Sequence, residues 1–225
     1  MHLFELQFAW FFSGITQLDY EKLVTAIRQK TPRTFVSPAT FIPLPPKAPP
    51  EIPRVQLQMP DNSARISIAL ARADFFVSSQ TAELTSEQIE AFFGDVNSIS
   101  EILLSATGVS RLGIVARIFK ECSEPVNEIA KAFLKRNFAN LQEASVKVVE
   151  RHVVDKFTYN DGYQFDQGIK LDTQNKILVI IRDLNTALEV PLIITKEIIR
   201  DFAALSRERL NSKYIEEIMG ADHVN

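Results

Sequence analysis

The sequence predicts an α+β fold in which one domain, residues 1–225, is built from two related halves. Segments with the two-residue period of strands alternate with segments that have the 3.6-residue period of helices. The predicted order is βαββα over residues 1–108 and βαβββα over residues 109–225, so one half is an elaborated copy of the other. Hairpin turns between strands favour mostly antiparallel sheets, with the helices packed on one face.

The composition is that of a globular domain that needs no disulfide or metal for its stability. Of the 225 residues, 46% are hydrophobic and 24% are charged. A chain of this length buries roughly 70% of the surface that its unfolded form exposes. The single cysteine, Cys122, cannot form an internal disulfide, which points to a reducing compartment or to a fold that is indifferent to its redox surroundings. A net charge of -3, with no run of five basic residues, disfavours nucleic acid as a partner.

The first strand is predicted at the N-terminus, in the stretch MHLFELQFAWFFSG. Alternation places Phe4, Leu6, Phe8, Trp10 and Phe12 on one face, and Leu3, Glu5, Gln7 and Ala9 on the other. The stretch lacks a basic start, carries Glu5 and is too short to span a bilayer. We therefore expect neither a signal peptide nor a membrane partner, and we expect a cytoplasmic protein.

A helix, a hairpin and a second helix complete the first half. Thr16 or Asp19 can cap the first helix, and Pro32 ends it. Its apolar stripe consists of Leu23, Val24 and Ile27. The hairpin alternates at Val55, Leu57 and Met59, turns at residues 60–63, and alternates back at Ile66, Ile68 and Leu70. The second helix spans residues 86–107, and Gly108 stands where a left-handed C-terminal cap belongs.

A proline-rich segment separates the first helix from the hairpin. Nine of the eleven prolines of the chain lie between Pro32 and Pro60. An extended proline-rich chain advances about 3.1 Å per residue, so a dozen residues can cross a whole domain. We interpret residues 32–60 as a stiff crossover on the surface of one fold. A docking peptide for a proline-binding groove and a hinge between two domains are the alternatives.

The second half begins with the strand SRLGIVARIFKE, which places Leu112, Ile114, Ala116 and Ile118 on one face. A helix follows, with Ser123 as its cap and Pro125 in its first turn. Its inward residues are Val126, Ile129, Ala130 and Phe133.

Three further strands are predicted as a meander between Ala144 and Leu184. Its first turn is expected at Asp161 and Gly162, and its second around residues 173–175. The last helix runs from about Thr195 to Met219, anchored by Ile198, Phe202, Leu205, Leu210 and Tyr214. If that helix exposes a second apolar stripe, we expect a homodimer to form there.

One strand of the meander carries a candidate pair of polar side chains. In SVKVVERHVVDKF, alternation places Glu150 and His152 on the face of Val146, Val148 and Val154. Such a pair is typical of a general base or of a cation-binding carboxylate. The alternative is a strand face that reaches solvent. Elsewhere the histidines are far apart, with no HxxxH or CxxC spacing, so we expect no metal site.

Arginines form a second candidate group. Arg111 and Arg117 share one face of their strand, where they can contact an anionic ligand or an acidic partner. Pairing with glutamates of a covering helix is the alternative. Arg65 and Arg72, seven residues apart, are expected on opposite faces of one strand.

Two short motifs resemble a sporadically distributed family of bacterial proteins without an assigned function. In that family a strand R-[IL]-G-L-x-Y-x-N-R-I follows a long helix, and an earlier hairpin carries a glutamine before an acidic turn. The stretches SRLGIVARIFKE and PRVQLQMPDNSARISI resemble these motifs, and Arg111, Leu112, Gly113, Arg117 and Ile118 match the strand motif. The tyrosine and the asparagine of the family are missing here, and Ala116 stands in place of the asparagine. The resemblance implies no activity.

The predicted duplication is also similar, in topology, to the effector-binding domains related to gyrase-inhibitory proteins. Those domains bind small, often cationic molecules in a cleft between repeats, commonly with a glutamate. The similarity implies that Glu150 or Glu5 supplies a carboxylate and that Trp10 and Tyr163 form aromatic walls. A shared fold does not fix function.

These observations favour a non-catalytic, cytoplasmic binding module that recognises a small ligand or a protein partner, without a cofactor. A partner-neutralising protein of the antitoxin or immunity type is one alternative. An acid/base enzyme that uses Glu150 and His152 is the other. A ligand-binding module predicts a cleft lined by Trp10 or Tyr163, a neutralising protein predicts an exposed apolar patch, and an enzyme predicts a closed pocket.

Overall fold

The computed structural model describes residues 1–14, 18–45, 47–79, 83–134, 140–189 and 192–210. Its strands form a nine-stranded sheet in the order β2-β3-β4-β5-β1-β6-β9-β8-β7, and all of its neighbours pair antiparallel. The strands are β1 (His2–Phe12), β2 (Thr40–Phe41), β3 (Val55–Gln58), β4 (Ala64–Ile68), β5 (Arg72–Ser78), β6 (Val109–Glu121), β7 (Val146–Val154), β8 (Phe157–Ile169) and β9 (Lys176–Thr186). The helices are α1 (Tyr20–Lys30), α2 (Ser86–Ala106), α3 (Pro125–Ile129) and α4 (Lys196–Arg209), and a π-helical turn (Ala130–Leu134) continues α3. The α+β prediction is confirmed.

The two halves repeat one arrangement within this single sheet. Apart from the two-residue β2, each half has a strand, a helix, a three-strand meander and a helix: β1-α1-β3-β4-β5-α2 and β6-α3-β7-β8-β9-α4. In each half the last meander strand pairs with the first strand, and β1 pairs with β6 in the middle. The sequence had predicted two strands in the first meander. It missed β5, because the chain turns after Ile68 and restarts its alternation at Arg72.

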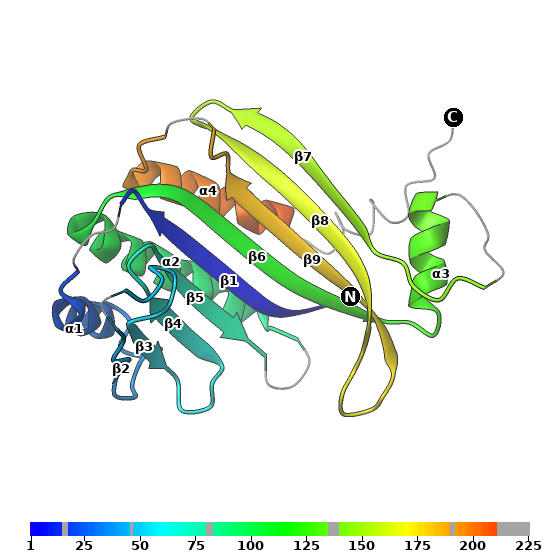
Figure 1. Cartoon of the computed structure of the whole chain (residues 1–225), viewed down its shortest axis with the longest axis horizontal. Coiled ribbons are helices and arrows are strands. Elements are labelled where there is room, and N and C mark those ends of the chain that lie inside the picture. Colours follow the sequence, from blue (N-terminus) through cyan, green and yellow to red (C-terminus); the bar gives the residue numbers. More distant parts are fainter. Residues whose placement is uncertain (15–17, 46, 80–82, 135–139, 190–191, 211–225) are drawn as a thin grey trace.

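The core lies on one face of the sheet, which we call the helix face. Figure 1 shows α2 and α4 behind the sheet and α3 near one end of it. One row of paired residues on the helix face is Phe8, Ile114, Leu184, Asp161 and Glu150. The main core joins β1, β5 and β6 to α1, α2 and α4, and a smaller cluster under α3 contains Ile118, Ile129, Phe165, Leu178 and Ile180.

Strand β1 follows its predicted faces with one correction. Leu6, Phe8, Trp10 and Phe12 are buried in the main core as predicted. Phe4 is not on their face, because a register shift between Leu3 and Glu5 bulges the strand. Its ring therefore contacts Phe119, while Leu3 packs against the main core.

Local sequence signals predicted some of the helix ends correctly and others wrongly. The carboxylate of Asp19 accepts a bond from the backbone N–H of Lys22, so Asp19 caps α1 as predicted. The N-cap position of α3 is held by Glu124 rather than Ser123, without a capping hydrogen bond from its side chain, while Pro125 holds its predicted place in the first turn. Gly108 is not left-handed. Instead it lies against Ser13, whose Oγ would be 2.2 Å from an added Cβ.

The first turn of the second meander was predicted wrongly. Strand β8 runs straight through Asp161 and Gly162, and the turn is the two-residue loop between Val154 and Phe157. Asp161 is held inside the sheet by Arg182, a distant partner that overrides the local turn signal. The second turn is confirmed, since Gln174 has a φ of 58° between β8 and β9.

The proline-rich segment belongs to the same sheet as the strands on either side of it. Its short strand β2 pairs with β3, and the carbonyl of Pro50 accepts bonds from the N–H groups of Leu70 and Ala71. Phe35 is buried against Phe75, whereas Phe41 is half exposed. These hydrogen bonds attach the segment to the sheet along its length, as is expected of a crossover within one fold.

The described part of the last helix ends at Arg209, so Tyr214 and Met219 lie outside the described residues. Within α4, Ile198 and Phe202 are buried as predicted, and the outward positions carry mainly charged residues. A second exposed apolar stripe is therefore not seen along this part of the helix. Among the described helices, none has the length and apolarity needed to cross a membrane.

Candidate functional site

Glu150 and His152, the pair proposed from the sequence, do meet on the helix face of β7. Glu150 Oε2 lies 3.3 Å from His152 Nε2, and the two side chains are 57% and 31% exposed. The imidazole ring stacks on Tyr159 of β8 with 5.1 Å between ring centroids. The pair therefore lies on a partly solvated strand rather than inside a closed pocket.

A buried polar cluster lies next to this pair, on β8 and β9. Arg182 Nε and Nη2 donate to the two carboxylate oxygens of Asp161 at 3.1 and 2.8 Å. Arg182 Nη2 also donates to Tyr163 Oη at 2.6 Å, and that hydroxyl donates to Asp161 at 3.1 Å. Asp161 and Arg182 are fully buried.

This cluster connects α4 to the second half of the sheet. Arg182 Nη1 donates to the backbone carbonyl of Arg209, at the C-terminal end of α4. A cation at a helix C-terminus is favourable, because the last carbonyls of a helix lack partners and carry partial negative charge. We assign the cluster a structural role.

Sequence reasoning missed Asp161 and Arg182 as functional or structural partners. The signal that could have found Asp161 is its period, since residues 157, 159, 161, 163 and 165 alternate as one strand face. The Asp-Gly pair was read as a turn instead. Arg182 has the same parity as the apolar residues Leu178, Ile180 and Leu184, which marks it as an inward-facing cation.

The expected aromatic walls do not line a cleft together. Trp10 is fully buried in the main core, where its indole N–H donates to Ser100 Oγ at 2.8 Å. Tyr163 is buried in the polar cluster on β8. Trp10 therefore does not lie with Glu150, His152 and Tyr163, which come from the second half.

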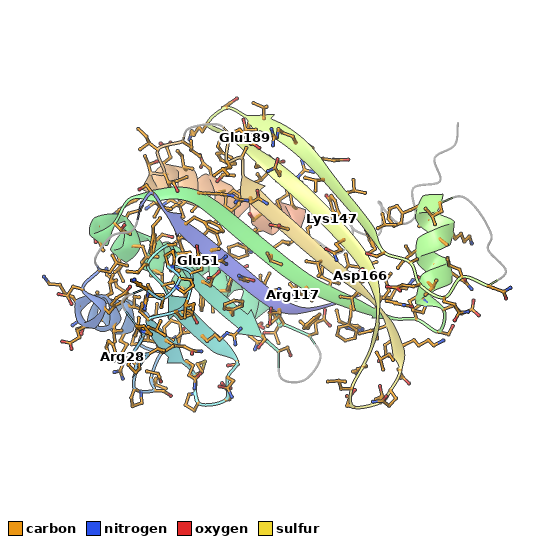
Figure 2. The ribbon with its side chains drawn as sticks, viewed as in Figure 1. Arg28, Glu51, Arg117, Lys147, Asp166 and Glu189 are labelled. Atoms are coloured by element: carbon orange, nitrogen blue, oxygen red, sulfur yellow. The ribbon has the colours of Figure 1, made fainter. Side chains whose placement is uncertain are left out.

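Arg111 and Arg117 share a face, as predicted, but their partners come from neighbouring strands. They lie on the face opposite the helix face, which we call the open face; it also carries Glu5, Lys147 and Arg151. Figure 2 shows Arg117 and Lys147 on this viewed side of the sheet. Arg117 forms an ion pair with Glu5 of β1. Arg111 donates to Asn185 Oδ1 at 2.7 Å and lies 5.0 Å from the ring centroid of Phe11.

The prediction for Arg65 and Arg72 was wrong. They belong to different strands, β4 and β5, and both lie on the open face, because Arg65 pairs with Phe76 in register. Arg65 packs over the ring of Phe76, and Arg72 forms an ion pair with Asp74. The arginines of the open face are thus largely neutralised or stacked, and they do not form a free anion site.

A pocket that sequence reasoning missed lies between α3 and the hairpin of β8 and β9. Its volume is about 680 Å³, within the range of about 300–1,000 Å³ that is common for ligand sites. Residues that line it include Glu124, Asn127, Gln142, Gln167, Ile169 and Lys176. We call it the α3 pocket. The residues proposed from the sequence do not line it.

Strand β7 carries three exposed apolar side chains. Val148, Val149 and Val153 are 38%, 55% and 79% exposed. Residues 147–151 form an unbroken exposed run. Strand β7 ends the sheet and pairs with β8 alone among the described strands (Figure 1).

The described residues were also compared for clusters of metal-ligating side chains. No group of three or more histidine, cysteine, aspartate or glutamate side chains is placed there to hold an ion. Cys122 is partly exposed, and burial raises the pKa of its thiol, as does the neighbouring Glu128. The thiol is therefore poorly ionised at neutral pH.

No protein-family model and no curated protein matches the chain, so these comparisons assign no function to the residues described above.

Proposed function

We propose that the protein is a non-catalytic binding module that recognises a protein partner by strand addition along β7. The observation that carries this proposal is the contrast between the two edges of the sheet. Unpaired edge strands invite pairing with another chain, and proteins commonly shorten or block them. Strand β2 is two residues long and lies in a proline-rich segment, whereas β7 has nine residues without a proline.

The backbone of β7 is suited to accept another strand. Val154 and Phe157 close a two-residue loop, so they form a hydrogen-bonded pair. The N–H groups of every second residue back from Val154 therefore point to β8. Those of Lys147, Val149, Arg151 and Val153 point away from the sheet, where an added strand would meet them.

Side chains on both faces of β7 add apolar contact area to that backbone. Val148 lies on the helix face, and Val149 and Val153 lie on the open face. In strand addition the main-chain bonds supply affinity and alternate side chains supply specificity. A neutralising protein of the antitoxin or immunity type would use this edge in the same way.

The proposal is tested by comparing two β7 variants with a matched surface variant in capture from native lysate. Val149→Pro removes one outward N–H, and Val153→Lys adds a charge to the edge. Leu171→Lys is the control, because Leu171 is 88% exposed but lies beyond the end of β8. Amide exchange of the purified complex is measured by NMR in parallel.

We expect the partner to be retained by the wild type and by Leu171→Lys and to be lost from both β7 variants. In the complex, the N–H groups of Val149, Arg151 and Val153 become protected from exchange. Equal capture by all variants, or free exchange of these three amides in the complex, contradicts the proposal.

The α3 pocket supports small-ligand binding as a second candidate function. Its size suits a ligand, and Glu124, Gln167 and Lys176 place charged and polar groups around it. Ile169→Trp would fill this pocket, while Leu171→Trp, two residues further on, provides a control. A compound that raises the melting temperature of the wild type and of Leu171→Trp, but not of Ile169→Trp, supports this function. An equal response of all three proteins contradicts it.

Acid/base catalysis stays a further proposal, because Glu150 and His152 are close enough to exchange a proton. Their partial exposure disfavours it, since catalytic groups gain strength where water is excluded. For any activity found, Glu150→Gln should abolish turnover and leave the melting temperature almost unchanged.

A further inference from the structure

We infer that the strand which adds to β7 is β7 of a second copy, antiparallel, with the two-fold axis at Arg151. This inference rests on the proposed function and names its partner. In a symmetric pair, residues opposite one another must lie on the same face of the joined sheet. Allowed pairings of the two β7 strands therefore differ in steps of two residues, so the two-fold axis can pass through any residue of β7.

Registers with the axis at Val149, Glu150 or Arg151 pair residues 146–152, 146–154 or 148–154 of β7 with the second copy, and any other axis pairs a shorter stretch. Charge separates these three registers. With the axis at Arg151, Lys147 faces Asp155 of the second copy, which is the first residue of the loop after β7, and Glu150 lies opposite its His152. Symmetry makes each contact twice. With the axis at Glu150, the two glutamates oppose each other. With the axis at Val149, Lys147 opposes Arg151 of the second copy twice, whereas the register with the axis at Arg151 opposes like charges only once, at the axis itself. Like charges directly opposite one another destabilise a pair of strands.

Lys147 and Asp155 have no ion-pair partner within the described residues, and both are exposed. Figure 2 shows Lys147 at the edge strand on the open face. Both side chains can therefore form the new contact without losing an existing one.

The like-charged residue at the axis is already held away from it. Arg151 Nε donates to Asn160 Oδ1 at 3.0 Å, and its Nη2 donates to Glu189 Oε2 at 3.1 Å. Both partners belong to the same chain and lie on the β8 side of Arg151 or in the loop after β9. The guanidinium is thus neutralised by its own chain, and two copies can approach at this position.

The same register joins the exposed valines. On the open face Val149 meets Val153 of the second copy, and on the helix face Val148 meets Val154. Each contact is again made twice. Apolar β-branched residues opposite one another are among the pairs that stabilise antiparallel strands. The described part of α4 presents mainly charged residues outward, so it is not the better surface for a homodimer.

The test is sedimentation equilibrium of the full chain at low ionic strength, where exposed charge pairs are least screened. Lys147→Glu and Asp155→Lys each turn two attractive contacts into two repulsive ones. We expect each variant alone to weaken dimerisation about tenfold or more. An equimolar mixture should recover association, because the introduced glutamate of one copy then faces the introduced lysine of the other.

Three results overturn the second-copy inference. They are a wild type that stays monomeric, variants that dimerise like the wild type, and a mixture that associates no better than its components. If the wild type is monomeric while Val149→Pro and Val153→Lys still lose a captured partner, strand addition stands and the second copy is wrong. If capture also ignores β7, both proposals fail.

Discussion

Replacing Arg182 with leucine would remove the cation from a fully buried ion pair and leave its carboxylate behind. Asp161 would lose the donors at 3.1 and 2.8 Å and keep the hydroxyl of Tyr163 at 3.1 Å. Hydrogen bonds to a charged group contribute about 1.5–3 kcal/mol each. Breaking a buried pair by removing one partner costs about 3–5 kcal/mol, because the remaining charge is uncompensated.

We therefore expect Arg182→Leu to lower the free energy of unfolding by about 3–5 kcal/mol. That is a large part of the total of about 5–15 kcal/mol that is typical of a domain. The loss also includes the bond to the carbonyl of Arg209, so the packing of α4 should weaken with it.

The assay is equilibrium unfolding in urea, followed by far-ultraviolet circular dichroism and by the fluorescence of Trp10, the single tryptophan. The control is the double variant Arg182→Leu/Asp161→Leu, which removes both charges. It should be more stable than Arg182→Leu alone, because a buried apolar pair costs less than one unpaired charge. A loss below about 1 kcal/mol for Arg182→Leu, or a double variant as unstable as the sum of the two single variants, would refute the reasoning.

Two further stability predictions follow from burial. Phe8→Ala should lower the free energy of unfolding by about 3–5 kcal/mol, because Phe8 is fully buried against Trp10 and Phe202. Phe4→Ala, on the bulge, should cost much less, and equal losses in urea unfolding would show that the faces of β1 are assigned wrongly. Burial raises the pKa of Asp95, against the lowering effect of the hydrogen bond from Thr34. The stability from this raised pKa is fully present below the ordinary carboxyl pKa of 3.8 and is lost as the pH rises through the raised value. As the pH rises through this range, the free energy of unfolding of Asp95→Asn should therefore increase relative to that of the wild type. A difference between the two proteins that stays constant with pH would contradict this prediction.

Much of the architecture was predictable because it depends on neighbours in the sequence. The alternation of Leu6, Phe8 and Trp10 identified the buried face of β1, since a strand turns successive side chains to opposite faces. Asp19 as a helix cap and Pro125 in a first turn were likewise local signals.

The candidate site was predicted only in part. Glu150 and His152 were placed together because they are two residues apart on one strand. Their neighbours Asp161 and Arg182 were missed, because pairing across three strands brings them beside β7. Trp10 was proposed for a cleft, but an aromatic residue on an apolar face can as well be core.

What the sequence by itself determined is the type and order of most elements, together with the inward faces of β3, β4, β6 and the part of β1 that follows its bulge. The tertiary structure alone decided that Asp161 lies within a strand and that the proline-rich segment ends one edge of the sheet. It also decided that β7 ends the other edge. The physical reason is the separation in sequence between the interacting residues. The periodicity of strands and helices and the capping of helices depend on residues a few positions apart. Strand order, buried ion pairs and exposed edges depend on contacts between residues far apart in the chain.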